Sequence, residues 1–287
     1  MGIKSTQKYI RERFGGEFVS GKYEGYHTTQ FGDATQSGGP EGITATGGTI
    51  SYYPMPGGVI WKSHVFHETG TFDVTALSGD DATYPNAVDW LIVGGGGGAG
   101  GDLSGGGGAG GVRSTVDDTG GSSPGSVETA ITLSATGGLT VTIGGGGAGN
   151  STNGAGTQGG SSSVAFAPGT IESYGGGGGA GDGTHAPPST NNLGSGGGAS
   201  SQKNEAGGTA NQGYGGGERD PTGTTGRSAG GGGGAGAVGA TGNYPFGQSA
   251  NGGDGVATTI AYGPSSPFYY GGGGGGGGGY GGSPTTA

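Results

Sequence analysis

The chain has 287 residues, of which 86 are glycine, and a formal net charge of −10. Glycine averages about 7% of protein sequences, and only 28% of this chain is hydrophobic, so side chains cannot fill an ordinary core along its whole length. The absence of cysteine excludes disulfides, thiolate catalysis and cysteine-ligated zinc. The acidic balance argues against a nucleic-acid partner, and no apolar stretch approaches the roughly 20 residues of a membrane span.

Residues 1–46 differ from the rest and are interpreted as an N-terminal anchor or interaction segment. The run 5–14 (STQKYIRERF) could form a short helix, capped by Ser5 or Thr6 and ended by Gly15 and Gly16. Such a helix is too short to be stable alone, so we expect it to order against a partner, and a frayed basic tail is an equal alternative. The candidate anchor residues are Lys4, Lys8, Tyr9, Ile10, Arg11, Arg13 and Phe14.

A β-strand portion is predicted over 47–93. Strands are expected at 49–53, 59–66 and 71–75, where apolar, aromatic and β-branched residues alternate with polar ones. The run 88–93 (VDWLIV) is typical of a buried strand.

Residues 94–287 form the predicted glycine-rich domain. Contiguous glycines occupy 94–98, 105–108, 144–147, 175–179, 230–234 and 271–279. Short β-like segments lead into several of these runs. A strand, a Pro/Gly turn, a second strand and a glycine run occur in that order at 163–179 and again at 258–279, which is a loose internal repeat.

Contiguous glycines limit what these runs can build. An α-helix is disfavoured by about 0.8–1.0 kcal/mol per glycine relative to alanine, and collagen needs glycine at every third position only. Polyproline-II-like rods remain, and glycine lets their backbones approach and pair their polar groups. The predicted fold class is therefore mostly β plus packed polyglycine-II helices, with very little α-helix. Valine should be more harmful at Gly275 than at Gly183. The few alanines admitted among the runs are Ala99, Ala109, Ala148, Ala180 and Ala235.

Three stretches carry a family resemblance: 65–74 (VFHETGTFDV), 88–101 (VDWLIVGGGGGAGG) and 105–113 (GGGGAGGVR). Their order resembles the glycine-rich domain family of tail-fibre and other virion proteins in marine and cyanobacterial phages. It is broadly similar to the glycine-rich adhesin tips of T-even-like phage fibres. The resemblance covers 47–282 and implies a β portion joined to polyglycine-II helices in an appendage that is often oligomeric. Family members commonly return to an apolar strand after the last glycine run, whereas this chain ends on GGSPTTA, so a neighbour's strand or truncation would explain the difference.

Candidate chemical sites are sparse, and no enzyme is predicted. His64, His67 and Glu68 are interpreted as strand-edge residues in preference to metal ligands. No cofactor is predicted. Calcium ligation by aspartates is left open beside their role as turn residues. These aspartates are Asp80, Asp81, Asp117, Asp118 and Asp220.

The polar segments 182–193 and 218–228 are predicted to be exposed loops on a rigid base. Their candidate receptor-binding residues are Asp182, His185, Asn191, Asn192, Glu218, Arg219, Asp220 and Arg227. Aromatics near loops could stack on sugars or pack against neighbours. They are Tyr214, Tyr244, Phe246, Tyr262, Tyr269 and Tyr280.

These features predict a phage virion protein, either a tail fibre or a receptor-binding component, located on the virion. Its expected partners are other virion proteins, further copies of itself (a homo-oligomer, with a trimer among the candidates) and a host cell-surface glycan or protein. Two alternatives remain open: a capsid- or tail-decorating subunit without receptor function, and a cellular extracellular filament or matrix protein.

Overall fold

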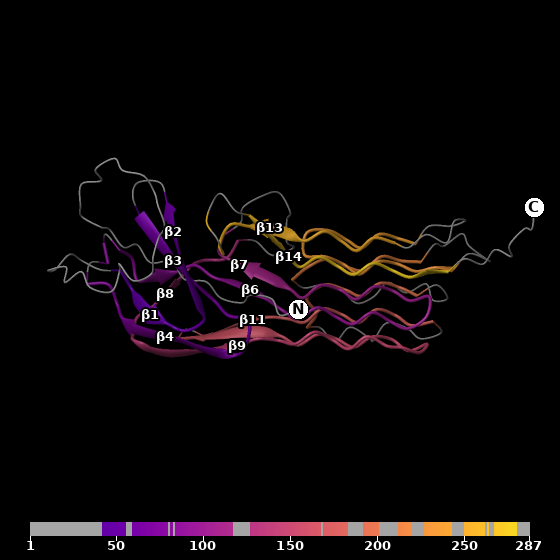
Figure 1. Cartoon of the computed structure of the whole chain (residues 1–287), viewed down its shortest axis with the longest axis horizontal. Coiled ribbons are helices and arrows are strands. Elements are labelled where there is room, and N and C mark those ends of the chain that lie inside the picture. The colour runs from indigo at the N-terminus through magenta and orange to yellow at the C-terminus, as the bar shows by residue number, and fades with distance from the viewer. Residues whose placement is uncertain are drawn as a thin grey trace, which may run out of the picture.

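A computed structural model describes residues 42–55, 59–79, 81–82, 84–116, 127–167, 169–182, 192–200, 212–219, 227–242, 250–261, 263 and 267–279. Two regions lie end to end in it: a strand-rich region and an array of extended glycine segments (Figure 1). No helix occurs within these ranges, which confirms the mostly-β prediction, and no helix there could cross a membrane. The helix predicted at 5–14 and the other anchor residues lie outside the described residues.

The strand-rich region is built on a five-stranded antiparallel sheet of order β1-β4-β9-β10-β11. Its strands are β1 (Thr44–Thr46), β4 (Gly70–Ala76), β9 (Gly137–Thr142), β10 (Ser162–Phe166) and β11 (Gly169–Ser173). Alternate residues of β10 are buried, including Val164 and Phe166, as expected for a strand with one face on a core.

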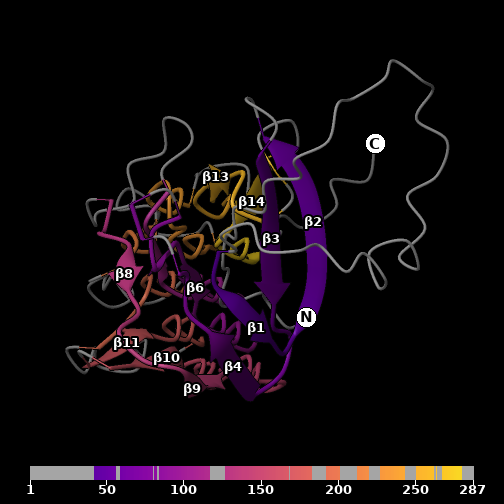
Figure 2. The ribbon, with the colours of Figure 1, turned by 90° about the vertical axis from the view of Figure 1, so that its left-hand side faces the viewer.

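Five further antiparallel pairs complete the strands. The pair β2–β3 is a long hairpin that stands beside the sheet (Figure 2). The pairs are β2 (Thr49–Met55) with β3 (Val59–Val65), β5 (Ala87–Val88) with β8 (Ile131–Thr132), β6 (Leu91–Val93) with β7 (Val112–Ser114), β12 (Arg227–Ser228) with β15 (Gly278–Gly279), and β13 (Val256–Thr258) with β14 (Phe268–Tyr270).

The expectation of one continuous strand over 88–93 was wrong, because the run changes partner part-way. Asp89 and Trp90 separate β5 from β6 and are held by Thr115 instead. The Thr115 hydroxyl accepts a hydrogen bond from the Trp90 amide at 3.0 Å and donates one to Asp89 Oδ1 at 2.9 Å. The other three predicted strands match β2, β3 and β4 to within a few residues.

Residues 90–93 join two hydrophobic clusters. Trp90 and Ile92 face the core of the strand-rich region, together with Phe72, Val141 and Val164. Leu91 and Val93 face the opposite way, into a smaller cluster with Val112, Val256, Ile260 and Tyr270. Because successive strand side chains point to opposite faces, this short run fastens both clusters to one backbone.

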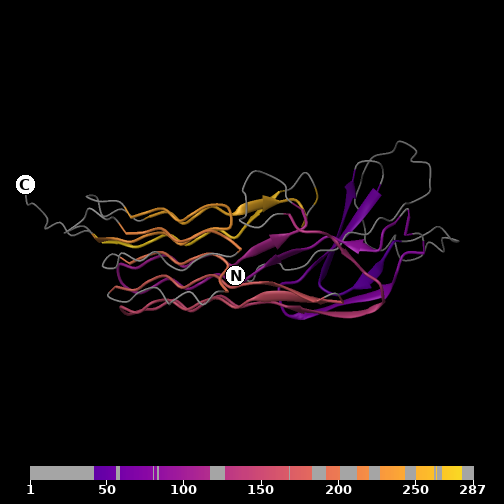
Figure 3. The ribbon, with the colours of Figure 1, turned by 180° about the vertical axis from the view of Figure 1, so that it is seen from behind.

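The glycine segments leave the strand-rich region and run side by side away from it (Figure 3). Several continue a strand directly, as 94–101 follows β6 and 271–277 follows β14. We call this set the glycine array, and we call the end away from the strands its distal end. Its segments are 94–101, 105–111, 144–150, 154–160, 174–182, 193–199, 213–218, 229–236, 237–242, 250–255 and 271–277.

Backbone hydrogen bonds between segments hold the array together, and they repeat at every third residue. The amides of segment 229–236 illustrate the pattern. Gly230 and Gly233 donate to Ala199 and Gly196; Gly231 and Gly234 donate to Ala240 and Ala237; Ala229, Gly232 and Ala235 donate to Gly277, Gly274 and Gly271. Its carbonyls accept from 105–111, 213–218 and 250–255. Segment 229–236 is thus bonded to six neighbouring segments.

The close approach of these backbones explains why glycine is required. A Cβ added at Gly232 would overlap the carbonyl of Gly107. Gly275 does not have the enclosed position expected of it, because it is exposed and an added Cβ would approach only the Ala250 oxygen, at 3.5 Å. Its comparison site, Gly183, lies outside the described residues, so the relative effect of valine at the two sites stays a prediction. Of the five alanines named above, Ala109, Ala180 and Ala235 are buried, whereas Ala99 and Ala148 are exposed.

Candidate binding surfaces

The distal end of the array collects several polar residues from different segments. Asp182 donates its amide to the Gly101 oxygen at 3.2 Å, and its Oδ1 is buried without a hydrogen-bond partner among the described residues. Glu218 is exposed, and its carbonyl accepts from the Gly242 amide at 2.8 Å. Arg227 lies in β12, opposite Gly279. The candidate receptor-binding residues Asp182, Glu218 and Arg227 therefore lie at one end of the molecule, and half-buried Arg219 directly follows Glu218.

Asn192 lies at the opposite end of the array. Its carbonyl accepts a hydrogen bond from Gln158 Nε2 at 2.8 Å, and the Gly194 amide donates to Gly175 beside β11. Segments 174–182 and 193–199 consequently run parallel. The two described ends of the predicted 182–193 loop are not brought together. His185, Asn191 and Asp220 lie outside the described residues.

The distal turn between 94–101 and 105–111 has an unusual backbone. Asp102 and Leu103 have φ of 43° and 38°, a left-handed conformation that is uncommon for residues with side chains. The Ser104 hydroxyl donates to the Gly100 oxygen at 2.6 Å and closes the turn. Asp102 is exposed there, beside the segment that Asp182 contacts.

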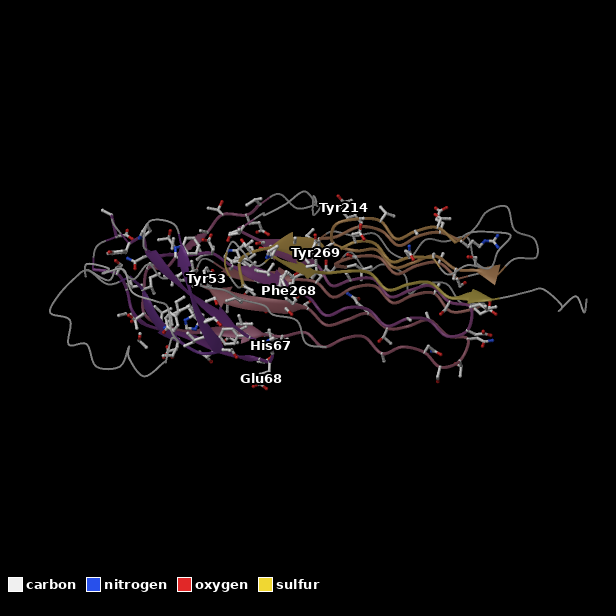
Figure 4. The ribbon with its side chains drawn as sticks, turned by 45° about the horizontal axis from the view of Figure 1, so that its top comes forward. Tyr53, His67, Glu68, Tyr214, Phe268 and Tyr269 are labelled. Carbon is white, nitrogen blue, oxygen red and sulfur yellow. The ribbon has the colours of Figure 1, made fainter. Side chains whose placement is uncertain are left out.

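A groove of about 340 Å³ lies where the array meets the strands. Its walls are the backbones of 94–96 and 144–146, and Val93 and Ile143 close its inner end. His67 and Glu68 also line it and are exposed, and Figure 4 shows both side chains near the strand end of the array. The Thr69 hydroxyl accepts from the Ile143 amide at 3.1 Å. Sequence reasoning missed this groove, although two strands running into glycine at 93–94 and 143–144 were a usable signal.

The two histidines of segment 64–67 have different surroundings. His64 is buried, with Nδ1 2.7 Å from the Gly47 oxygen and its ring edge-on to Phe72 at 5.0 Å. It belongs to the core, whereas His67 is exposed. Asp81 accepts a hydrogen bond from the Asn86 amide at 2.6 Å, which is a turn role. No cluster of three metal-ligating side chains occurs within the described ranges. Asp80, Asp117 and Asp118 lie outside them.

Exposed aromatic side chains lie at the junction between the two regions. Phe268 is 54% exposed and Tyr269 73% exposed, and Figure 4 shows both beside the base of the array. The next residue of β14, Tyr270, is buried, and burial raises its pKa to about 12. Tyr214 is half-buried. Tyr244, Phe246, Tyr262 and Tyr280 lie outside the described residues. The junction thus offers an aromatic surface for sugars or protein neighbours.

Comparison with known proteins gives one match. The family model described as the glycine-rich domain matches residues 67–287. Searches of curated proteins and of solved structures find no match. The matched range includes β4, all later strands through β15 and all segments of the array. It covers well over half of the chain, which therefore belongs to the glycine-rich domain family.

Proposed function

We propose that the segments of the array are polyglycine-II helices and that the array is a rigid support for binding loops. A polyglycine-II rod has three residues per turn and makes no internal hydrogen bonds. The three-residue repeat of bonds from 229–236 to six neighbours is the observation that supports this proposal. Each amide and carbonyl of such a rod points outward, so neighbouring rods satisfy it in place of water.

Hydrogen exchange tests the rod geometry. In segment 94–101 the amides of Gly97 and Gly98 donate to Gly108 and Thr157, whereas the described residues offer no acceptor to Gly96. We expect the Gly96 amide to exchange much faster than the Gly97 and Gly98 amides, with the fast position recurring at Ala99. Uniformly fast exchange along 94–101 would contradict a packed rod.

In function, the chain is proposed to be a structural and adhesive component of a bacteriophage virion, part of a tail fibre or receptor-binding tip. Two features support this assignment. A cross-bonded array resists bending along its length because no rod can shift without breaking bonds to several others. Its distal end carries polar side chains from separate segments, among them Asp182 and Glu218, as expected for recognition of a glycan or protein.

Localisation on the particle tests this assignment. An antibody raised against the chain should label the tips of the tail fibres on purified virions from the phage that encodes it. Label at regular sites over the capsid or tail tube would favour a decorating subunit. Virions without label would contradict a virion role altogether and would direct attention to a cellular filament.

Adhesion is tested with the distal residues. The purified chain should bind cells of the phage's host, and the double variant Glu218→Ala/Arg219→Ala should bind more weakly while keeping its melting temperature. Ala substitution of His67 and Glu68, at the opposite end of the array, is the matched control. Equal binding by all variants would exclude the distal end as the receptor surface.

A further inference from the structure

The glycine array has an incomplete position beside segment 105–111. Five segments bond to this one: 94–101, 174–182, 193–199, 229–236 and 271–277. Segment 229–236, by comparison, is bonded on all six sides. Within the described residues, the sixth side of 105–111 is unoccupied. We call it the notch.

Two backbone donors point into the notch. Gly107 and Gly110 are both buried, and neither amide has a hydrogen-bond partner among the described residues. The directions of the hypothetical Cβ atoms locate the gap. From Gly107 and Gly110 they point at segment 94–101, and from Gly106 at Gly274. The unpaired amides thus point between 94–101 and 271–277.

The walls of the notch also offer acceptors. The carbonyls of Gly94 and Gly97 receive no hydrogen bond from the described part of the chain, although neighbouring carbonyls at Gly95, Gly96 and Gly98 do. Donors on the floor and acceptors on one wall match the alternating groups of one further extended backbone. Leaving such donors buried and unpaired is unfavourable, which favours an occupant.

The two walls of the notch, 94–101 and 271–277, consist almost entirely of glycine backbone, and this limits the chemistry of the occupant. At Gly96, on the wall formed by 94–101, an added Cβ would lie 3.8 Å from the Gly108 oxygen. This part of the wall is therefore uncovered, although the backbone of 105–111 is near. Segments this close to each other leave little room for side chains, and the array buries only small ones such as Ala109 and Ala235. A run of consecutive glycines therefore suits the notch, and segment 271–277 of a second copy provides one.

The shape of the edge favours a second copy for a geometric reason. Segment 271–277 is itself the ridge beside the notch, and nothing lies within 4 Å of a Cβ added at Gly272. A ridge next to a notch is self-complementary under a two-fold rotation, because each copy can place its ridge in the other's notch. We propose that two copies of this chain pair in this way, so that one glycine array continues into the next. This pairing rests on the packed-rod proposal above.

Oligomeric state with matched glycine variants tests the pairing. Sedimentation of the full chain should show a reversible dimer. Gly272→Val on the ridge and Gly96→Val on the wall should each abolish it, because a side chain there occupies the space of the incoming rod. Gly215→Val is the control, since it is also open within 4 Å but lies on the segment 213–218, which borders neither the notch nor its ridge. It should leave the dimer intact.

Thermal melting separates the two proposals. All three substitutions are on open positions, so each variant should melt as the separated wild-type chain does at low concentration. A wild type that stays monomeric at high concentration, or a dimer that survives both Gly96→Val and Gly272→Val, would overturn the pairing while leaving the packed array untouched. Dissociation by Gly215→Val as well would also overturn it.

Discussion

The strand-rich region and the glycine array respond to opposite changes in sequence. Around Trp90 and Phe72, buried side chains fill space between strands, so removing atoms leaves a cavity. In the array, backbones such as Gly232 and Gly107 fill the space themselves, so adding atoms forces them apart. One chain thus contains a core maintained by large residues and another maintained by the absence of side chains.

The largest expected effect is from valine inside the array. Gly232→Val should destabilise the protein by more than the roughly 1–3 kcal/mol typical of an overpacked core, because the obstacle is the backbone of Gly107 and not a movable side chain. Thermal unfolding followed by circular dichroism measures the loss. Gly145→Val is the matched control, since nothing lies within 4 Å of its added Cβ. Similar losses of stability in both variants would contradict the view that close backbone packing makes Gly232 intolerant of a side chain.

The opposite experiment applies to the strand-rich region. Phe72→Ala should cost about 3–5 kcal/mol, because Phe72 is only 1% exposed and the change leaves a cavity in the core. The free energy of unfolding in urea measures it. Thr71→Ser, on the exposed face of the same strand, should change stability by no more than about 0.5 kcal/mol. A small effect from Phe72→Ala would mean that the array alone carries the stability.

A smaller effect is expected where the regions meet. The Ser173 hydroxyl at the end of β11 is buried and donates to the Gly111 oxygen at 2.6 Å. Ser173→Ala should cost about 0.5–1.5 kcal/mol, since Gly111 keeps its bond from the Gly94 amide. Ser163→Ala is the control, because Ser163 is a half-buried residue of β10. In the Ser173→Ala variant, hydrogen exchange should be faster at the first amides of 94–101. Unchanged exchange at these amides would mean that the Ser173 hydrogen bond does not couple β11 to the array.

The smallest effect concerns pH. Partial burial raises the pKa of Asp89 above its ordinary 3.8, and the hydrogen bond from Thr115 opposes this only in part. The folded protein thus holds a proton that the unfolded chain has lost, so the free energy of unfolding decreases as pH rises from 3.8 through the folded pKa. Asp89→Asn keeps the oxygen acceptor and should flatten this slope in urea titrations from pH 3 to 7. If the slope is unchanged in this variant, the pH dependence of the free energy of unfolding arises from other carboxyl groups.

Local pattern in the sequence was enough for the strands that alternate. The ranges of β2, β3 and β4 were predictable because apolar and polar residues alternate there with the period of a strand. The run 88–93 misled, because a continuous apolar run gives no sign of where hydrogen bonding passes from one partner to another. That change depends on Thr115, which is distant in sequence and adjacent only in the fold.

Composition favoured the close approach of glycine backbones, because contiguous glycines disfavour an α-helix and do not fit the collagen pattern. It could not determine which glycines lie inside, since Gly232 and Gly275 are each flanked by two glycines on both sides, but one is enclosed by other segments and the other is exposed. The same holds for the candidate site. Loop residues were identifiable as polar segments, yet only the parallel course of 174–182 and 193–199 placed Asp182 and Asn192 at opposite ends. Whether a glycine is enclosed depends on which segments surround it, and only the tertiary structure determines those neighbouring segments.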